Sequence, residues 1–191
     1  QRMISQLLQF REIESQKITL NRQPGDLIRF IDSVFSLFEF YASRKGIETD
    51  FRSSYECFYT RFDHDVIEKI FTNLVSNAIK YTSESGYVGV RIARATAEEA
   101  SRLAGPAEAG STEYLSLTVT NTGAEIPEDK REIIFESFNR LSTRRPGFES
   151  STGLGLSIVK ELVANLEGSI TLHSGDSKVS FTVVLPFTQD V

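Results

Sequence analysis

The order of helical and strand-like segments is the strongest constraint on what this chain can fold into. Apolar residues recur at helical spacing in three long segments, residues 27–45, 66–82 and 153–167. Strand-like segments surround them, at 17–23, 47–51, 57–62, 87–95 and 114–121 and in a final hairpin of SITLHS and VSFTVVLPF. Helices and strands do not alternate regularly, so the sequence predicts an α/β or α+β fold with a mixed sheet.

Turn and capping residues mark the ends of these segments. Pro24-Gly25-Asp26 is predicted to form a turn, with Asp26 as the N-cap of the first long helix and Gly46 at its end. Asp63 is predicted to cap the second long helix, and Gly168 to end the third.

Four segments are less regular. Residues 1–17 carry an apolar stripe at helical spacing, which fits either a helix folded back on its own domain or the end of a helical hairpin. Residues 97–113 lack hydrophobic periodicity and are predicted to form an exposed connection. A short helix is predicted at 128–138, and a loop rich in Ser, Thr, Gly and Pro at 142–152.

Composition excludes several classes of protein. The chain has 191 residues and a net charge of −5, which argues against a nucleic-acid surface. Cys57 is the only cysteine, so neither an intrachain disulfide nor a cysteine-based zinc site is expected. His64 and His173 are the only histidines, so a histidine-rich metal centre is not expected either. No apolar run reaches the length of about 18–20 residues that spans a bilayer. The chain begins at Gln1 rather than Met, which suggests a fragment of a longer protein.

Three polar residues follow one line along the second helix, beside its apolar stripe. Asn73, Asn77 and Lys80 are spaced i, i+4 and i+7. The apolar stripe is predicted to consist of Ile67, Phe71, Leu74, Ala78 and Tyr81. Amide oxygens suit Mg²⁺ and lysine suits phosphate, so this line could hold a metal–nucleotide. The alternative is that they are ordinary residues at the boundary of the core.

Two glycine-bearing segments add to this pattern. Asn121 and Gly123 follow a strand and offer an acceptor and close backbone approach to a purine edge, although a plain turn would use the same residues. Gly153 and Gly155 begin a helix, where free backbone amides can bind phosphate. The spacing is neither that of a P-loop nor that of a dinucleotide-binding fingerprint. A basic loop that carries Arg140, Arg144 and Arg145 precedes this helix and fits a lid.

Taken in order, four motifs resemble the N, G1, F and G2 boxes of sensor histidine kinases, in the GHKL ATP-binding superfamily. They are NLVSNAIKYT, NTGAEIP, IFESFNR and TGLGLSIVKELV. The resemblance implies an α/β sandwich, in which three helices cover one face of a mixed sheet of about five strands. Residues 1–17 resemble the end of the second dimerisation and phosphotransfer helix, and 18–191 the catalytic domain, with its lid at about 139–152.

The resemblance also implies roles for single residues. Asn77 would be the Mg²⁺ ligand, helped by Asn73, while Lys80 and Arg140 would contact phosphate. The further nucleotide-binding positions that it implies are Tyr81, Asn121, Gly123, Ile126, Phe138, Thr152, Gly153, Leu154, Gly155 and Leu156. The chain departs from the usual Asp-x-Gly-x-Gly pattern of the G1 box, with Asn121 for the Asp and Glu125 for the second Gly. The leading Gly of the G2 box is Ser151.

Position 73 distinguishes two chemistries within the superfamily. Its gyrase-type ATPases carry a general-base Glu four residues before the metal Asn, and an amide at Asn73 cannot accept that proton. These ATPases also commonly carry an Asp at the position of Lys80. The sequence therefore predicts transfer of the γ-phosphoryl group of ATP to a protein histidine, with Mg²⁺ as cofactor. His64 and His173 match no acceptor motif, so the acceptor is expected outside this chain.

The resemblance further implies partners and a location. The expected partners are ATP, the protein's own dimerisation helices in a homodimer, and a response-regulator receiver domain, with no nucleic acid and no direct membrane contact. The expected location is cytoplasmic, in the intracellular part of a membrane-anchored receptor kinase. The alternative is a degenerate domain that binds nucleotide weakly and acts as an interaction module, because of Asn121 and Glu125.

Overall fold

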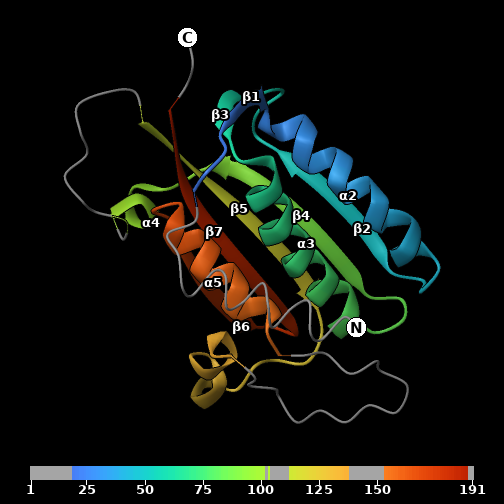
Figure 1. The fold of residues 1–191 in the computed structure, drawn as a ribbon. Helices are drawn as coiled ribbons and strands as arrows, with labels where there is room; N and C mark the ends of the chain where they lie inside the picture. Colours follow the sequence, from blue (N-terminus) through green and yellow to red (C-terminus); the bar gives the residue numbers. More distant parts are fainter. Residues whose placement is uncertain (1–18, 102, 104–111, 138–152, 189–191) are drawn as a thin grey trace.

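Five strands form one mixed sheet, with the spatial order β2-β4-β5-β7-β6 (Figure 1). The structure is a computed structural model that describes residues 19–101, 103, 112–137 and 153–188. The strands are β2 (Glu48–Ser53), β4 (Tyr87–Arg94), β5 (Thr112–Thr122), β6 (Ser169–Gly175) and β7 (Lys178–Thr188). β2 and β4 run parallel, and the other neighbouring pairs are antiparallel. The predicted mixed sheet and final hairpin are confirmed.

Three helices cover one face of this sheet (Figure 1). They are α2 (Leu27–Ser43), α3 (His64–Tyr81) and α5 (Gly155–Asn165). The predicted caps are confirmed, because the Asp26 side chain accepts from Ile28 N and Arg29 N, and that of Asp63 from Val66 N. Gly46 has φ +66°, the left-handed conformation that ends α2.

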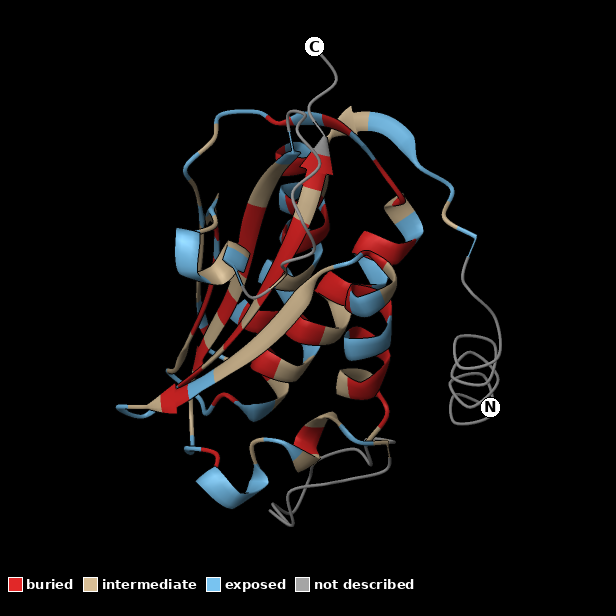
Figure 2. Cartoon of the chain, turned by 90° about the vertical axis from the view of Figure 1, so that its left-hand side faces the viewer, coloured by how far each residue is buried: buried red, intermediate tan, exposed pale blue. Residues whose placement is uncertain are grey.

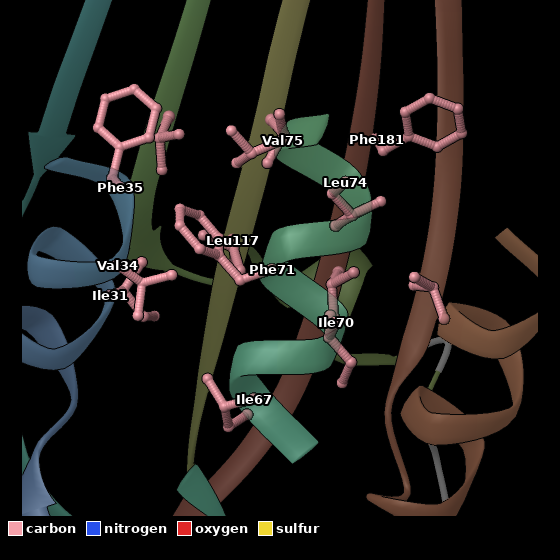
Figure 3. Packing of buried hydrophobic residues seen from close by; sticks show 14 of the residues in the cluster. Ile31, Val34, Phe35, Ile67, Ile70, Phe71, Leu74, Val75, Leu117 and Phe181 are labelled. Carbon is pink, nitrogen blue, oxygen red and sulfur yellow. The ribbon is translucent and has the colours of Figure 1, made fainter. Parts of the chain in front are cut away.

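The central helix α3 buries a wider face than its predicted stripe. Ile70, Val75 and Ile79 are buried as well, whereas Tyr81 is 48% exposed and does not belong to the stripe. The reason is the position of α3 between α2 and α5, which gives it neighbours on three sides (Figure 1). Figure 3 shows its apolar side chains between α2 and the sheet, and Figure 2 shows how buried residues line the facing sides of helices and strands.

The first strand lies later in the chain than predicted. β1 (Gln23–Asp26) pairs antiparallel with β3 (Tyr59–Phe62), so the predicted strand at 17–23 and the predicted turn at 24–26 are wrong for the described residues. Pairing with β3 overrides the turn preference of Pro24-Gly25. Proline is tolerated because β1 has a neighbour on one side only within the described sheet.

Three smaller differences concern other segments. The predicted helix at 128–138 is two 3₁₀ turns, η1 (Glu128–Lys130) and η2 (Ile133–Phe135). The connection at 97–113 contains a short helix α4 (Ala97–Ser101), and β5 begins at Thr112. The predicted helix at 1–17 and the predicted lid at 139–152 lie outside the described residues.

The end of α5 uses its glycine in an unexpected way. The positive φ, +58°, falls on Glu167 rather than on Gly168. A Cβ at Gly168 would lie 2.5 Å from both Leu185 Cδ2 and the Val184 carbonyl oxygen. Glycine is therefore required here for close packing of the helix end on β7.

Candidate functional site

The start of α5 lies against the polar line of α3. A Cβ built on Gly155 would be 3.0 Å from Asn73 Oδ1 and 3.6 Å from Asn77 Nδ2. Gly153 has φ +72°, and Leu154 is fully buried, which anchors this turn in the core. Two motifs more than 70 residues apart in the sequence thus share one surface.

The two asparagines have different surroundings. Asn73 Nδ2 donates a hydrogen bond of 2.7 Å to the Lys69 carbonyl oxygen, which turns Oδ1 toward Gly155. Asn77 is half-buried, and its side chain makes no hydrogen bond to any residue within the described ranges. Lys80 Nζ lies 5.3 Å from the ring centre of Tyr81 at the end of the same helix. α3 therefore presents two amides and an ammonium on consecutive turns.

The N-terminus of α5 has the character of an anion site. Its N-cap residue Leu154 offers no capping side chain, so the first backbone N–H groups of the helix have no side-chain acceptor among the described residues. The helix dipole adds positive potential there. Asn73 Oδ1 beside these groups supplies a neutral hard oxygen of the kind that Mg²⁺ accepts. The donor set thus fits a magnesium–phosphate group.

The G1 segment begins at the end of β5, beside the end of α3. Asn121 is 4% exposed, and its Nδ2 donates to the Thr122 carbonyl oxygen at 3.2 Å. Within the described part of the chain, no hydrogen bond reaches the side-chain amide oxygen Oδ1 of Asn121. A Cβ at Gly123 would lie 2.9 Å from the Tyr81 carbonyl oxygen, so the two segments touch through their backbones. Asn121, Gly123 and Tyr81 therefore cluster at one end of the site.

The remaining predicted residues divide into two groups. Ile126 and Leu154 are buried and Leu156 is half-buried against the core, so Leu154 can reach a nucleotide only through its backbone. The others, Phe138, Arg140 and Thr152, lie outside the described residues.

Sequence reasoning missed the residues that hold the G1 segment in place. Ile126 N donates to Ser174 Oγ at 2.8 Å, and Arg131 Nη2 donates to the Ser174 carbonyl oxygen at 2.9 Å. Ser177 N donates to Glu125 Oε1 at 3.1 Å. The two serines lie about 50 residues further along the chain, and the pairing of β7 with both β5 and β6 brings them here.

Residues 62–189 match the family model described as "Histidine kinase-, DNA gyrase B-, and HSP90-like ATPase". The chain belongs to this family. This confirms the predicted GHKL fold and its ATP-binding class, and the similar proteins do not favour the degenerate alternative.

The named relatives are histidine kinases. Hybrid signal transduction histidine kinase D of Dictyostelium discoideum is 31% identical over 100% of this chain and 12% of its own length. Sensor histidine kinase WalK of Bacillus subtilis is 28% identical over 99% of this chain and 29% of its own length. The chain therefore spans a small part of the relatives it matches.

Solved structures of histidine kinases have the same fold as this chain. The catalytic domain of histidine kinase ThkA superposes with a TM-score of 0.71 at 26% identity, covering 88% of this chain and 97% of that one. Full-length ShkA in complex with AMPPNP superposes with a TM-score of 0.77 at 25% identity, covering 100% of this chain and 36% of that one. Within the described ranges, no helix is both long and apolar enough to cross a membrane.

Proposed function

We propose that this domain binds ATP with Mg²⁺ and transfers the γ-phosphoryl group to a histidine on a dimerisation domain outside this chain. The observation that carries the proposal is the close approach of the Asn73 and Asn77 side chains to the start of α5 at Gly155, where the N-cap residue Leu154 makes no side-chain cap hydrogen bond. It joins an amide oxygen, Asn73 Oδ1, which suits a cation, to backbone donors for an anion on one surface. Such a pairing suits a metal-bound polyphosphate better than it suits a cation or an anion alone.

Different residues of the site would bind the metal, the phosphates and the base. Asn77, with Asn73 beside it, would hold Mg²⁺, which when bound would neutralise charge on the phosphates. Lys80 and the amides at the start of α5 would bind the phosphate oxygens, joined by Arg140 from the sequence. The base end would be formed by Asn121, with its side-chain oxygen Oδ1 as acceptor for the exocyclic amine of adenine.

Transfer rather than hydrolysis follows from the same positions. A general base for water would have to stand beside the phosphates, and the side chain at position 73 is an amide whose nitrogen is engaged by the Lys69 carbonyl oxygen. The nucleophile would be an imidazole of a partner segment. Positioning and charge neutralisation then account for the chemistry.

The partners and location of the whole protein belong to this proposal. We propose that the acceptor lies on the protein's own dimerisation helices in a homodimer, and that a receiver domain is the next acceptor. The names of the similar proteins, a hybrid signal transduction histidine kinase and a sensor histidine kinase, support a role in signalling. A position on the cytoplasmic side of a membrane-anchored receptor kinase fits these names.

Calorimetric titration of the chain with ATP in the presence and absence of Mg²⁺ tests the binding step. Saturable binding that Mg²⁺ strengthens is expected, and Asn77→Ala should remove the strengthening by Mg²⁺. Asn165→Ala is the matched control, because this amide lies at the far end of α5 and bonds the Glu161 carbonyl oxygen. A folded sample without saturable binding would contradict the proposal.

A second experiment tests the transfer step. The chain is mixed with ATP, Mg²⁺ and a polypeptide that carries the dimerisation hairpin of the same protein. The expected product is acid-labile phosphohistidine on the hairpin, lost in Asn77→Ala. Release of free phosphate at the same rate with and without the hairpin would indicate an ATPase instead.

A further inference from the structure

The turn between β6 and β7 holds two residues in a sparsely populated backbone conformation. Asp176 has φ +52° and Ser177 has φ +56°, and neither is glycine. They form a two-residue hairpin turn, because Gly175 and Lys178 are the last paired residues on either side. In such a turn the N–H and C=O groups of Ser177 point away from the ladder and need other partners.

Both of these groups bond to the segment that follows Asn121. Gly123 N donates to the Ser177 carbonyl oxygen at 3.0 Å, and Ser177 N donates to Glu125 Oε1 at 3.1 Å. The two bonds run in opposite directions between the same pair of loops. We call Gly123, Glu125 and Ser177 the turn clamp.

A second set of bonds fixes the other end of the segment. Ile126 N donates to Ser174 Oγ, and Arg131 Nη2 donates to the Ser174 carbonyl oxygen. Residues 123–126 are therefore tied to the β6–β7 hairpin at both ends. Ala124 and Glu125 are the exposed residues between these attachments.

The turn clamp acts directly on the surroundings of Asn121. The Cβ position of Gly123 is 3.2 Å from Asn121 Nδ2 and 2.9 Å from the Tyr81 carbonyl oxygen. Gly123 therefore lies close to both the Asn121 amide and the end of α3, and its position shapes the surroundings of both. None of the clamp bonds touches Asn73, Asn77 or Gly155 at the other end of the site.

We propose that Glu125 is a positioning residue for the nucleotide base, acting through Ser177 and Gly123 on the Asn121 amide. The carboxylate adds a side-chain hydrogen bond to the backbone hydrogen bond between Gly123 and Ser177, and it makes the β6–β7 turn part of the base site. This inference rests on the function proposed above, with the base at Asn121 and the phosphates at α3 and α5.

The inference predicts an effect confined to one end of the ligand. Loss of one hydrogen bond near solvent is expected to weaken base binding about three- to tenfold. Phosphate binding should stay unchanged, because its residues lie on α3 and α5. If Glu125 had a merely structural role, its loss would weaken base binding and phosphate binding equally.

NMR titrations of the full chain separate these outcomes, because they detect weak binding. The probes are ATP with Mg²⁺, adenosine, and tripolyphosphate with Mg²⁺, and the exchange of the Ser177 amide with solvent is measured in parallel. The variants are Glu125→Ala and Glu125→Gln. Glu132→Ala is the control, since this exposed carboxylate makes no hydrogen bond or ion pair with a described residue.

Glu125→Ala should raise the dissociation constants of ATP and adenosine by the same factor, leave that of tripolyphosphate unchanged and speed exchange of the Ser177 amide. Glu125→Gln keeps an acceptor and should restore most of the affinity, and Glu132→Ala should match the wild type. Unchanged ATP and adenosine affinity in Glu125→Ala, or an equal loss for tripolyphosphate, would overturn the inference. A wild-type chain that binds no ATP would overturn the proposed function, and this inference with it.

Discussion

The Cβ position of Gly155 lies 3.0 Å from Asn73 Oδ1, a separation that leaves no room for a methyl group unless the amide moves. Such a movement would strain the hydrogen bond of 2.7 Å from the amide nitrogen to the Lys69 carbonyl oxygen. Gly155→Ala should therefore displace the Asn73 oxygen and weaken binding of ATP with Mg²⁺ about tenfold or more. The folded state should be little affected, since alanine is a better helix former than glycine. Calorimetric titration and thermal unfolding measure the two effects.

The matched control for Gly155→Ala is Lys160→Ala, which changes an exposed residue of the same helix and should alter neither quantity. If Gly155→Ala bound ATP as tightly as the wild type, the amide of Asn73 would not be a ligand. A lower melting temperature with unchanged affinity would have the same meaning.

Gly123, like Gly155, is not expected to tolerate replacement by alanine, but for a different reason. A Cβ there would lie 2.9 Å from the backbone oxygen of Tyr81, and backbone cannot swing aside as a side chain can. Gly123→Ala should cost about 1–3 kcal/mol of unfolding free energy, from urea titration, and should also weaken ATP binding. Ala124→Ser changes the exposed neighbouring residue and should leave both values as they are. An alanine variant of full stability would show that the β5 end and the α3 end are not in contact.

The sequence could predict each motif and the class of fold, because hydrophobic periodicity and caps are local signals. Asp26 and Asp63 cap their helices as predicted, and the predicted strand at 114–121 buries Leu115, Leu117 and Val119 at alternate positions. The contact between α3 and α5 could be expected only from the resemblance to a family. Local pattern carries no information on which helices become neighbours.

Two features could not have been predicted. The strand β1 contains Pro24-Gly25, which locally favours a turn, and it exists because β3 supplies the pairing partner. Glu125 looked like the loss of a glycine, whereas its carboxylate has a partner 52 residues away at Ser177. A contact of that sequence separation depends on the completed hairpin of β6 and β7.

The β6–β7 turn allows a prediction about stability alone. Ser177→Gly should raise the unfolding free energy by about 0.5–1 kcal/mol, because glycine adopts positive φ without strain and keeps both backbone groups of the turn clamp. Ser177→Ala is the control, since it removes the hydroxyl and retains the strained φ, and it should bring no gain. Urea unfolding of the wild type and the two variants measures the unfolding free energy of each. Equal stability of the glycine and serine forms would mean that the turn is not strained.

A cluster at the edge of the molecule should make stability depend on pH. The hydrogen bond of 2.6 Å from the Tyr55 hydroxyl, together with Arg94, holds the pKa of Glu113 below its ordinary value of 4.5. Burial and the neighbouring Glu113 raise the pKa of Tyr55 above 10.0. The lowered pKa of Glu113 means that its contribution is present above pH 4.5 and is lost as the pH falls through the folded-state pKa. The raised pKa of Tyr55 means that its contribution is present below pH 10.0 and is lost as the pH rises further.

Glu113→Gln should therefore lower the melting temperature most between pH 4.5 and pH 10.0. The corresponding loss of unfolding free energy should be no more than about 1 kcal/mol, because the cluster lies close to solvent. The difference from the wild type should close as the pH falls below 4.5, where the carboxylate of the folded wild type takes up its proton. Melting curves of both proteins, recorded at intervals of about one pH unit from about pH 3 to about pH 9, measure this difference in melting temperature. Glu161→Gln, a change at an exposed carboxylate of α5, is the control that should follow the wild type. A difference between Glu113→Gln and wild type that stays constant into acid would show that Glu113 stabilises the fold by packing rather than by its charge.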